Sequence, residues 1–221
     1  MRSRQEIKAI AKAAMKEQRA TSILALLLVG LLAGAGGFVS GLFFFVPFFG
    51  IVLMYASIFF IGMPLAVNAV GIYIKIYKRQ LASANELLSN FPINYLRKVG
   101  GMAWMMLFTM LWSLLFFIPG IIKGISYSMT ASILADCPNV NAKQALKLSM
   151  RMTDGHKMDL FVMQLSFIGW TMLSMLTCGI LSIVFVGPYM STTSAGYYVE
   201  LREKAIANGV IDRAELEGRL Q

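Results

Sequence analysis

Fifty-five consecutive residues, from 20 to 74, carry no charged side chain, and this run limits the fold more than any other feature of the sequence. A continuous helix of that length would reach about 80 Å, whereas the hydrocarbon core of a bilayer is about 30 Å thick. The run therefore predicts two membrane crossings, near residues 22–40 and 50–74, with a break in the Gly-, Phe- and Pro-rich segment 41–50. We expect Pro64 to kink the second helix.

Two further apolar blocks extend this pattern. Residues 99–135 contain a single charge, Lys123, and residues 160–199 contain none. Turn signals at Pro119-Gly120 and Cys178-Gly179 divide the two blocks. Only 14% of the chain is charged, against about 25% in a soluble domain, and the mean hydropathy is +0.67. We therefore predict an all-α fold, a polytopic helical membrane protein with about six transmembrane helices in a single membrane domain over residues 1–221. The other four crossings are placed near 99–117, 118–135, 160–177 and 180–199.

The charged residues test this number of crossings. With six crossings and the N-terminus inside, the cytoplasmic segments hold 19 of the 20 Lys and Arg residues and all eleven acids. Because positive charge accumulates on the cytoplasmic side, we expect both termini to be cytoplasmic. If residues 118–135 only dipped into the bilayer, the basic loop that follows would be exported, which the charge bias disfavours. The formal net charge of +9 has the same explanation, so we expect no nucleic-acid partner. The cytoplasmic segments are 1–21, 75–98, 136–159 and 200–221.

Two of these segments predict basic amphipathic helices. Ser3 and Glu6 have the spacing of a capping box in the first, as do Asn141 and Gln144 in the second. Each helix carries Lys or Arg at every fourth position along one stripe. Such helices can lie on anionic headgroups of the inner leaflet, with about 1 kcal/mol per basic residue. Topology anchoring and contact with a membrane-protein partner are the alternatives. The expected contact residues are Lys8, Lys12, Lys16, Lys143, Lys147, Arg151, His156 and Lys157.

Two shorter cytoplasmic helices are predicted from the same spacing. One is capped by Ser83 with Glu86, and the other by Asp212 with Glu215. The second follows a helix stop at Asn208-Gly209.

Small and polar residues within the predicted crossings indicate helix packing. A GxxxG pair in the first crossing lets helix backbones approach closely in lipid. We expect this ridge to pack against another helix of the same chain, with a homodimer as the alternative. The two amides are expected to hydrogen-bond between helices. The residues expected at such contacts are Gly30, Gly34, Gly37, Asn68, Gln164, Gly169 and Trp170.

The residue types that enzymes use are scarce. One histidine and two cysteines are too few for a four-ligand zinc site, and Cys137 and Cys178 are expected on opposite sides of the membrane. The sequence has no phosphate-binding, dinucleotide-binding, zinc-protease, kinase or hydrolase motif. We therefore expect neither enzymatic activity nor a cofactor. The alternative is a membrane-embedded enzyme in which His156 acts with Asp154 or Asp159, although Gly155 also fits a simple helix boundary.

Transport is a further alternative. Ion-coupled transport usually requires carboxylates inside the membrane, and no Asp or Glu lies within the predicted crossings. A permease- or channel-like component could still use backbone carbonyls at broken helices. The candidate breaks are Pro47, Pro64, Pro119 and Pro188.

Three groups of residues resemble the signatures of a known family. They are Ile118-Pro119-Gly120-Ile121-Ile122-Lys123 with Tyr127-Ser128-Met129, Asp136 and Pro138; Lys157 and Phe161 with Leu165-Ser166-Phe167-Ile168-Gly169-Trp170; and Pro188-Tyr189 with Tyr197-Tyr198. Together they resemble the bacterial integral-membrane family called domain of unknown function 975, typical of Gram-positive bacteria, over nearly the whole chain. One departure is Cys137, where the family pattern leads us to expect Asn.

The resemblance implies a multi-pass protein of the bacterial plasma membrane, and it brings no activity, cofactor or catalytic residue. Combined with the charge pattern, it leads us to expect a non-enzymatic membrane protein. Its basic cytoplasmic surface would contact anionic lipid or a membrane-protein partner.

Overall fold

The computed structural model describes the chain except residues 1, 43–46, 116, 178 and 219–221, together with the side chains of some neighbours of these gaps. In the described part every regular element is helical and there is no strand, so the all-helical prediction is confirmed there. The first half contains α1 (Arg4–Glu17), α2 (Arg19–Leu42), α3 (Pro47–Ser57), the π-helical turn η1 (Ile58–Gly62), α4 (Met63–Tyr77), α5 (Glu86–Ser89) and α6 (Tyr95–Leu115). The second half contains α7 (Phe117–Tyr127), α8 (Thr130–Asp136), α9 (Ala142–Thr153), α10 (Lys157–Leu165), α11 (Ile168–Leu176), η2 (Ser182–Val186), α12 (Gly187–Ala207) and α13 (Arg213–Leu216).

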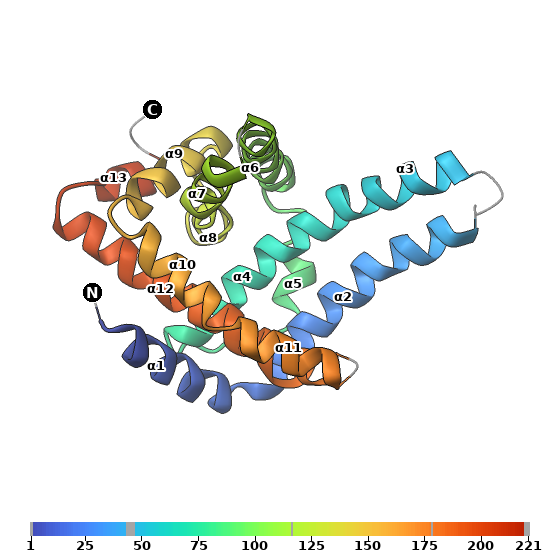
Figure 1. Cartoon of the computed structure of the whole chain (residues 1–221), viewed down its shortest axis with the longest axis horizontal. Helices are drawn as coiled ribbons and strands as arrows, with labels where there is room; N and C mark the ends of the chain where they lie inside the picture. The colour runs from blue at the N-terminus through green and yellow to red at the C-terminus, as the bar shows by residue number, and fades with distance from the viewer. Residues whose placement is uncertain (1, 43–46, 116, 178, 219–221) are drawn as a thin grey trace.

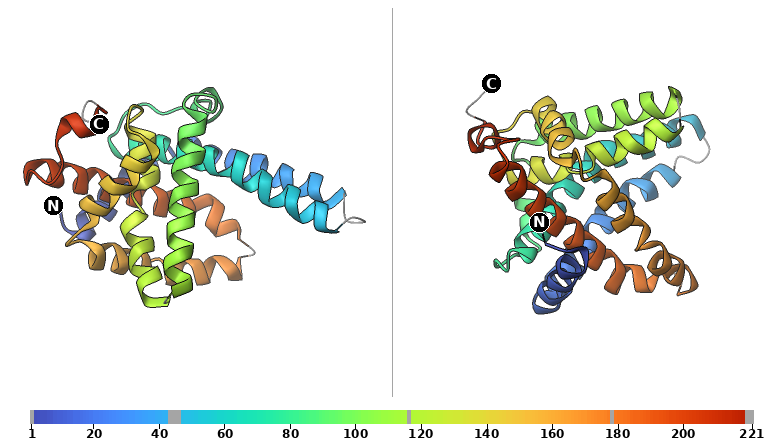
Figure 2. Two further views of the ribbon diagram at one scale, coloured as in Figure 1. Left: turned by 90° about the horizontal axis from the view of Figure 1, so that it is seen from above. Right: turned by 60° about the vertical axis from the view of Figure 1, so that its left-hand side comes forward.

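The long helices form hairpins that diverge from a common base. One hairpin pairs α2 with α3, a second pairs α6 with α7, and a third pairs α10–α11 with η2–α12 (Figures 1 and 2). The base is built from α1, α8, α9, α13 and the ends of α4 and α12 that meet them. Both chain ends lie at this base (Figure 1).

The core of the molecule lies in the base rather than in the hairpins. Tyr197 and Tyr198 of α12 are completely buried there, and Ile72 of α4 belongs to the same core. The hairpins instead expose large apolar side chains: Leu114 is 79% exposed and Leu176 is 82% exposed. A contiguous apolar surface of this kind indicates contact with lipid or with another protein.

Few of the helices are individually long and apolar enough to cross a membrane. Among the described residues two qualify, Phe49–Tyr77 with 29 residues and Lys157–Leu176 with 20. A third is added if Arg4–Glu17 and Arg19–Ala35, which meet at 90°, count as one broken span. Six crossings therefore stay a prediction.

The expected kink at Pro64 takes the form of a change in helix type. The π-helical turn η1 ends directly before α4, and Pro64 lies in the first turn of α4. Because proline has no N–H, the carbonyl of Phe60, four residues earlier, lacks its helical donor. The hydroxyl of Tyr95 donates to this carbonyl at 2.7 Å, so a side chain from α6 replaces the missing hydrogen bond.

The break between the third and fourth predicted crossings lies within two residues of its predicted position, since α6 ends at Leu115 and α7 begins at Phe117. The turn signal at Pro119-Gly120 lies in the first turn of α7 rather than in the connection. Proline is tolerated there because its missing N–H would have no partner within the helix. Gly120 serves close packing, since a Cβ at this position would lie 2.4 Å from the Ser113 hydroxyl of α6.

Most of the predicted helix ends are confirmed. Capping boxes form at Ser3 with Glu6, at Asn141 with Gln144, and at Asp212 with Glu215. Gly155 and Gly209 have positive φ angles of 74° and 65°, as expected where a helix stops. The short helix predicted after Ser83 is present as α5, although its cap position is Asn85 rather than Ser83. The Ser83 hydroxyl accepts from the N–H of Asn85 at 3.3 Å, whereas the Glu86 carboxylate pairs with Lys75 at 2.8 Å instead of completing a capping box.

Candidate functional site

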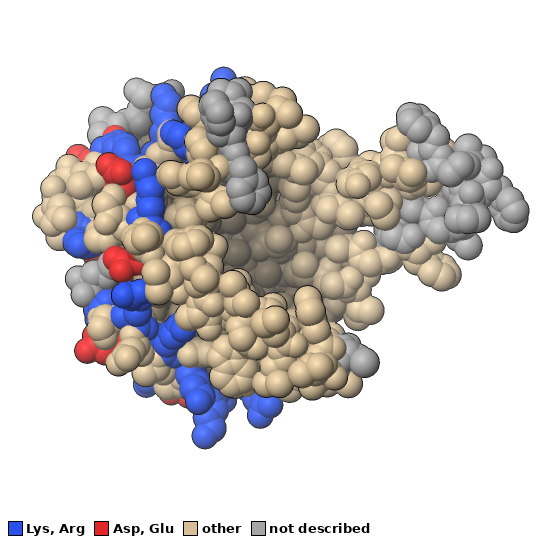
Figure 3. Space-filling view, viewed as in Figure 1, with Lys and Arg blue, Asp and Glu red and all other residues tan. Residues whose placement is uncertain are grey.

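Charged side chains gather at the base, and the hairpins are almost free of them in the same view. In Figure 3 the Lys, Arg, Asp and Glu residues lie on the side that carries α1, α9, α13 and both chain ends. The predicted contact residues all belong to this side. Their individual surroundings divide them into free cations and cations that hold the base together.

The basic stripe of α1 is only partly free. Lys12 and Lys16 are exposed and form no ion pair with any described residue. Lys8 is different, because its ammonium donates to the hydroxyl of Ser166 and lies 4.7 Å from the centre of the Phe167 ring. Burial against α10 and α11 lowers the pKa of Lys8. Lys8 therefore fastens α1 to the junction of these two helices.

The stripe of α9 is divided in the same way. Lys147 is exposed and has no ion-pair partner in the described part of the chain. Lys143 is also exposed and lies 4.9 Å above the ring of Trp104 in α6. Arg151 pairs with Glu215 of α13 at 2.9 Å and also donates to the carbonyl of Val210. Arg151 thus ties α13 to α9.

In the polar cluster around His156, the imidazole is not hydrogen-bonded to either neighbouring acid. The Nδ1 atom of His156 lies 3.6 Å from the Asp159 carboxylate and makes no hydrogen bond within the described structure. Asp154 pairs with Lys157 at 3.2 Å. At 3.6 Å the histidine and carboxylate are beyond normal hydrogen-bond distance.

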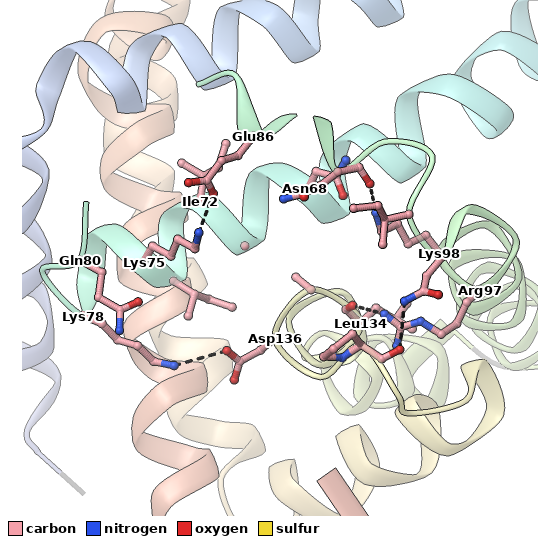
Figure 4. Close-up of a pocket in the computed structure, with 17 residues that line it drawn as sticks. Asn68, Ile72, Lys75, Lys78, Gln80, Glu86, Arg97, Lys98, Leu134 and Asp136 are labelled. Atoms are coloured by element: carbon pink, nitrogen blue, oxygen red, sulfur yellow. Dashed lines mark hydrogen bonds and ion pairs between the residues drawn. The ribbon is translucent and has the colours of Figure 1, made fainter. Parts of the chain in front are cut away.

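A cavity of about 300 Å³ lies between α4, the start of α6 and the end of α8. Four cationic and two acidic side chains line it (Figure 4). Both acids are already paired, Glu86 with Lys75 at 2.8 Å and Asp136 with Lys78 at 3.3 Å. Asn68, predicted to bond between helices, is buried here and donates to the carbonyl of Leu87 at 2.9 Å.

Asp136 joins three helices at one end of the cavity. Besides Lys78 of α4, its carboxylate accepts from Arg202 of α12 at 2.8 Å and from the hydroxyl of Tyr198 at 3.1 Å. The thiol of Cys137 is buried and lies 3.9 Å from the same hydroxyl. The residue that departs from the family pattern therefore packs inside this junction.

Two adjacent cations stand at the other end of the cavity. Arg97 donates to the carbonyls of Leu134, Cys137 and Val140 at 2.5–2.8 Å, so it caps the C-terminal end of α8. Lys98 is only 5% exposed, and its ammonium donates to the carbonyl of Asn90 at 2.6 Å. Burial, and then the neighbouring charge of Arg97, lowers the pKa of Lys98 to about 8.

The predicted packing glycines make no close contact within the described chain. Nothing lies within 4 Å of a Cβ built on Gly30, Gly34 or Gly169, and all three are exposed. The contact of α2 with η1 instead uses Ala33 and Gly62, since a Cβ built on Gly62 would lie 3.6 Å from the Cβ of Ala33. The surroundings of Gly37 lie outside the described residues. Intrachain packing of this ridge is thus not seen, and the homodimer stays a prediction.

The two other predicted packing residues differ from each other. Gln164 is exposed, and its side chain has no hydrogen bond in the part of the chain that the structure describes. Trp170 packs on Phe185 of η2, with the ring centres 5.6 Å apart. Contact across the third hairpin therefore depends on an aromatic pair rather than on an amide.

Comparison of the sequence with models of known protein families identifies the family. The model of a family described as "Protein of unknown function (DUF975)" matches residues 51–205. The chain belongs to this family. The resemblance inferred from the signature residues is thereby confirmed, and the matched region contains every residue that lines the cavity. No curated protein and no solved structure matches the chain.

Sequence reasoning did not predict the cavity. Its cations lie in two short segments. Residues 75–78 follow the first apolar run and residues 97–98 precede the next, so their charges were interpreted only as the boundaries of these runs. One signal was present, because Asp136 belongs to the family signature and is an acid directly after an apolar segment. Among the described residues no group of three His, Cys, Asp or Glu side chains could hold a metal ion.

Proposed function

We propose that this member of the family is a non-enzymatic, multi-pass plasma-membrane protein whose basic cytoplasmic surface binds anionic lipid headgroups. In this proposal the three hairpins supply six crossings, and both termini lie in the cytoplasm. The observation that carries it is the separation of charge in Figure 3, with the ionic residues at the base and exposed apolar side chains along the hairpins.

Four exposed lysines form the proposed contact surface. They are Lys12 and Lys16 of α1 with Lys143 and Lys147 of α9. Because no described carboxylate pairs with them, their charge is available to an anionic surface. A basic residue near such a surface contributes about 1 kcal/mol. Arg151 and Lys157 are excluded from this set because each is paired with an acid, and Lys8 is excluded because it is half-buried against α10 and α11. Lys143 is kept because its contact with the Trp104 ring leaves the ammonium exposed and its charge unneutralised.

Lipid retention tests the contact surface. The full chain and its Lys143→Gln/Lys147→Gln variant are incorporated into nanodiscs of phosphatidylcholine with phosphatidylglycerol, and the retained lipids are counted by native mass spectrometry. Two lost contacts are expected to weaken retention of the anionic lipid roughly thirtyfold, at about 1 kcal/mol each. The matched control is Arg79→Gln/Lys157→Gln, which also removes two charges but at residues already paired with acids.

The outcomes separate the alternatives. Equal retention by the wild type and the Lys143/Lys147 variant would contradict the lipid-contact proposal. A protein that co-purifies in fixed ratio and is lost only in that variant would replace lipid with a membrane-protein partner. The six-crossing topology is tested by labelling single cysteines from outside the cell. They are placed at residues 139 and 209 for the cytoplasmic side, and at Thr177→Cys, an exposed residue at the outer end of the predicted crossing 160–177, for the outer side. Labelling at position 139 or 209 would contradict it.

A further inference from the structure

The buried ammonium of Lys98 and the half-buried guanidinium of Arg97 point to a ligand that the surface lysines do not explain. Arg97 and Lys98 are adjacent, and within the described residues neither has a carboxylate within 4.0 Å. The Nε atom of Arg97 is buried without a hydrogen-bond partner. Lys98 has three N–H donors, and a single acceptor is seen for them. Uncompensated buried charge is unfavourable, and an anion in the cavity would relieve it.

The charge of the lining suggests the class of anion. Lys75, Lys78, Arg97 and Lys98 outnumber Glu86 and Asp136 by two charges. A phosphomonoester carries about −1.5 to −2 at pH 7, whereas a carboxylate or a phosphodiester carries −1. The phosphomonoester therefore matches the lining best. The volume of about 300 Å³ is at the small end of ligand sites, which suits a group of that size.

The positions of the cations fit a group held from two sides. Figure 4 shows Lys75 and Lys78 of α4 at one side of the cavity and Arg97 and Lys98 of α6 at the other. Lys75 and Lys78 each have one carboxylate partner and retain further donors. The lowered pKa of Lys98 is consistent with an ammonium that lacks an anionic neighbour.

We propose that this cavity binds a phosphomonoester group, with Lys98 as its principal ligand and Lys75 and Lys78 on the facing wall. The group belongs either to the headgroup of phosphatidic acid or to a small soluble phosphomonoester. The proposal goes beyond lipid contact at the surface, since no cavity residue belongs to the exposed stripes.

Binding is measured on the full chain in two arms. In the first, the chain in phosphatidylcholine nanodiscs is titrated with glycerol 3-phosphate by isothermal calorimetry. In the second, native mass spectrometry compares nanodiscs that contain phosphatidic acid with nanodiscs that contain the phosphodiester lipid phosphatidylglycerol. Saturable binding in the first arm assigns a soluble ligand, and preferential retention in the second assigns the lipid. Either result supports the proposal.

Two variants locate the site. Lys98→Met is expected to weaken binding by about tenfold or more, because a hydrogen bond between charged groups is lost. Lys98→Gln keeps a donor for the Asn90 carbonyl, so it separates loss of charge from damage to the fold. The control Lys147→Gln removes the same charge from an exposed site and is expected to bind normally.

Three results would overturn the proposal. They are absence of binding in both arms, equal binding by the wild type and both Lys98 variants, and equal retention of the phosphodiester lipid. The surface proposal is judged separately, because Lys143→Gln/Lys147→Gln leaves the cavity intact.

Discussion

Asp136→Ala is expected to loosen the base, because this carboxylate holds α4, α8 and α12 together. Its removal leaves the Lys78 ammonium, the Arg202 guanidinium and the Tyr198 hydroxyl without their common acceptor. The side chain of Asp136 is 16% exposed, and those of Lys78 and Arg202 are 28% and 26% exposed. Removing one partner of a buried ion pair costs about 3–5 kcal/mol. Partial exposure of the cations places the expected loss near the lower end, at about 3 kcal/mol.

Thermal unfolding of the purified chain in detergent, followed by intrinsic fluorescence, measures this loss. For a chain of this size 1 kcal/mol corresponds to a change in Tm of about 2–4 °C, so we expect a decrease of roughly 6–12 °C. The control is Glu17→Gln, whose pair with Arg79 at 3.4 Å is more than half exposed on both sides. An exposed pair contributes less than about 1 kcal/mol, so the control should lower the Tm by at most a few degrees.

A double-mutant cycle shows whether the carboxylate and the guanidinium act as a unit. Asp136→Ala and Arg202→Met are made singly and together. Because the two groups are in contact, the combined loss should fall short of the sum by about 1 kcal/mol or more. Simple additivity, or a loss for Asp136→Ala no larger than that for Glu17→Gln, would refute this account of the base.

Two further predictions concern buried positions. Lys98→Met should be more stable than the wild type at pH 7. The fall of the lysine pKa from 10.5 to about 8 corresponds to an unfavourable contribution of about 3 kcal/mol to folding, which the variant avoids. The variant also loses the hydrogen bond to Asn90, so its net gain in stability is smaller than this. The unfolded chain binds the extra proton between these two values, so wild-type stability should rise with pH from 8 to 10.5 and the difference from Lys98→Met should shrink. Urea unfolding of both proteins at pH 7, 8, 9 and 10 measures this difference in stability. A difference that does not change with pH would contradict the lowered pKa of Lys98. Gly196→Ala should cost about 1–3 kcal/mol, because its Cβ would lie 2.4 Å from the buried ring of Tyr77. The same thermal assay should find Gly169→Ala nearly neutral, and equal effects would show that the contact at Gly196 relaxes freely.

The helical character of the chain could be predicted because charge-free runs interrupted by Gly and Pro leave few other folds. Helix ends with their own chemical signal were also predictable, such as the capping box of Ser3 and the positive φ at Gly209. Pro119 misled the prediction because proline is found both in turns and in the first turn of a helix. Local sequence alone did not distinguish these two cases.

The proposed contact surface was less predictable because periodicity assigns a residue to a face but not to a neighbour. Lys8, Lys12 and Lys16 share a stripe, yet Lys8 packs on Phe167 while the other two stay exposed. The cavity depends on contacts between segments more than fifty residues apart, such as Lys78 with Asp136. No pattern within a single helix contains that information.

The two groups of cations in the base differ in what they imply about function. An exposed lysine such as Lys147 has almost no effect on folding, so its presence says little about a ligand. Lys98 is expected to destabilise the fold while it is buried without an anion, because its hydrogen bond to Asn90 offsets only part of the cost of burying the charge, and binding of an anion would offset the rest. A purely structural lysine and a ligand-binding lysine therefore predict opposite results for the same substitution. If Lys98→Met gains stability and loses phosphomonoester binding, the charge serves the ligand; if it loses stability, the charge serves the fold.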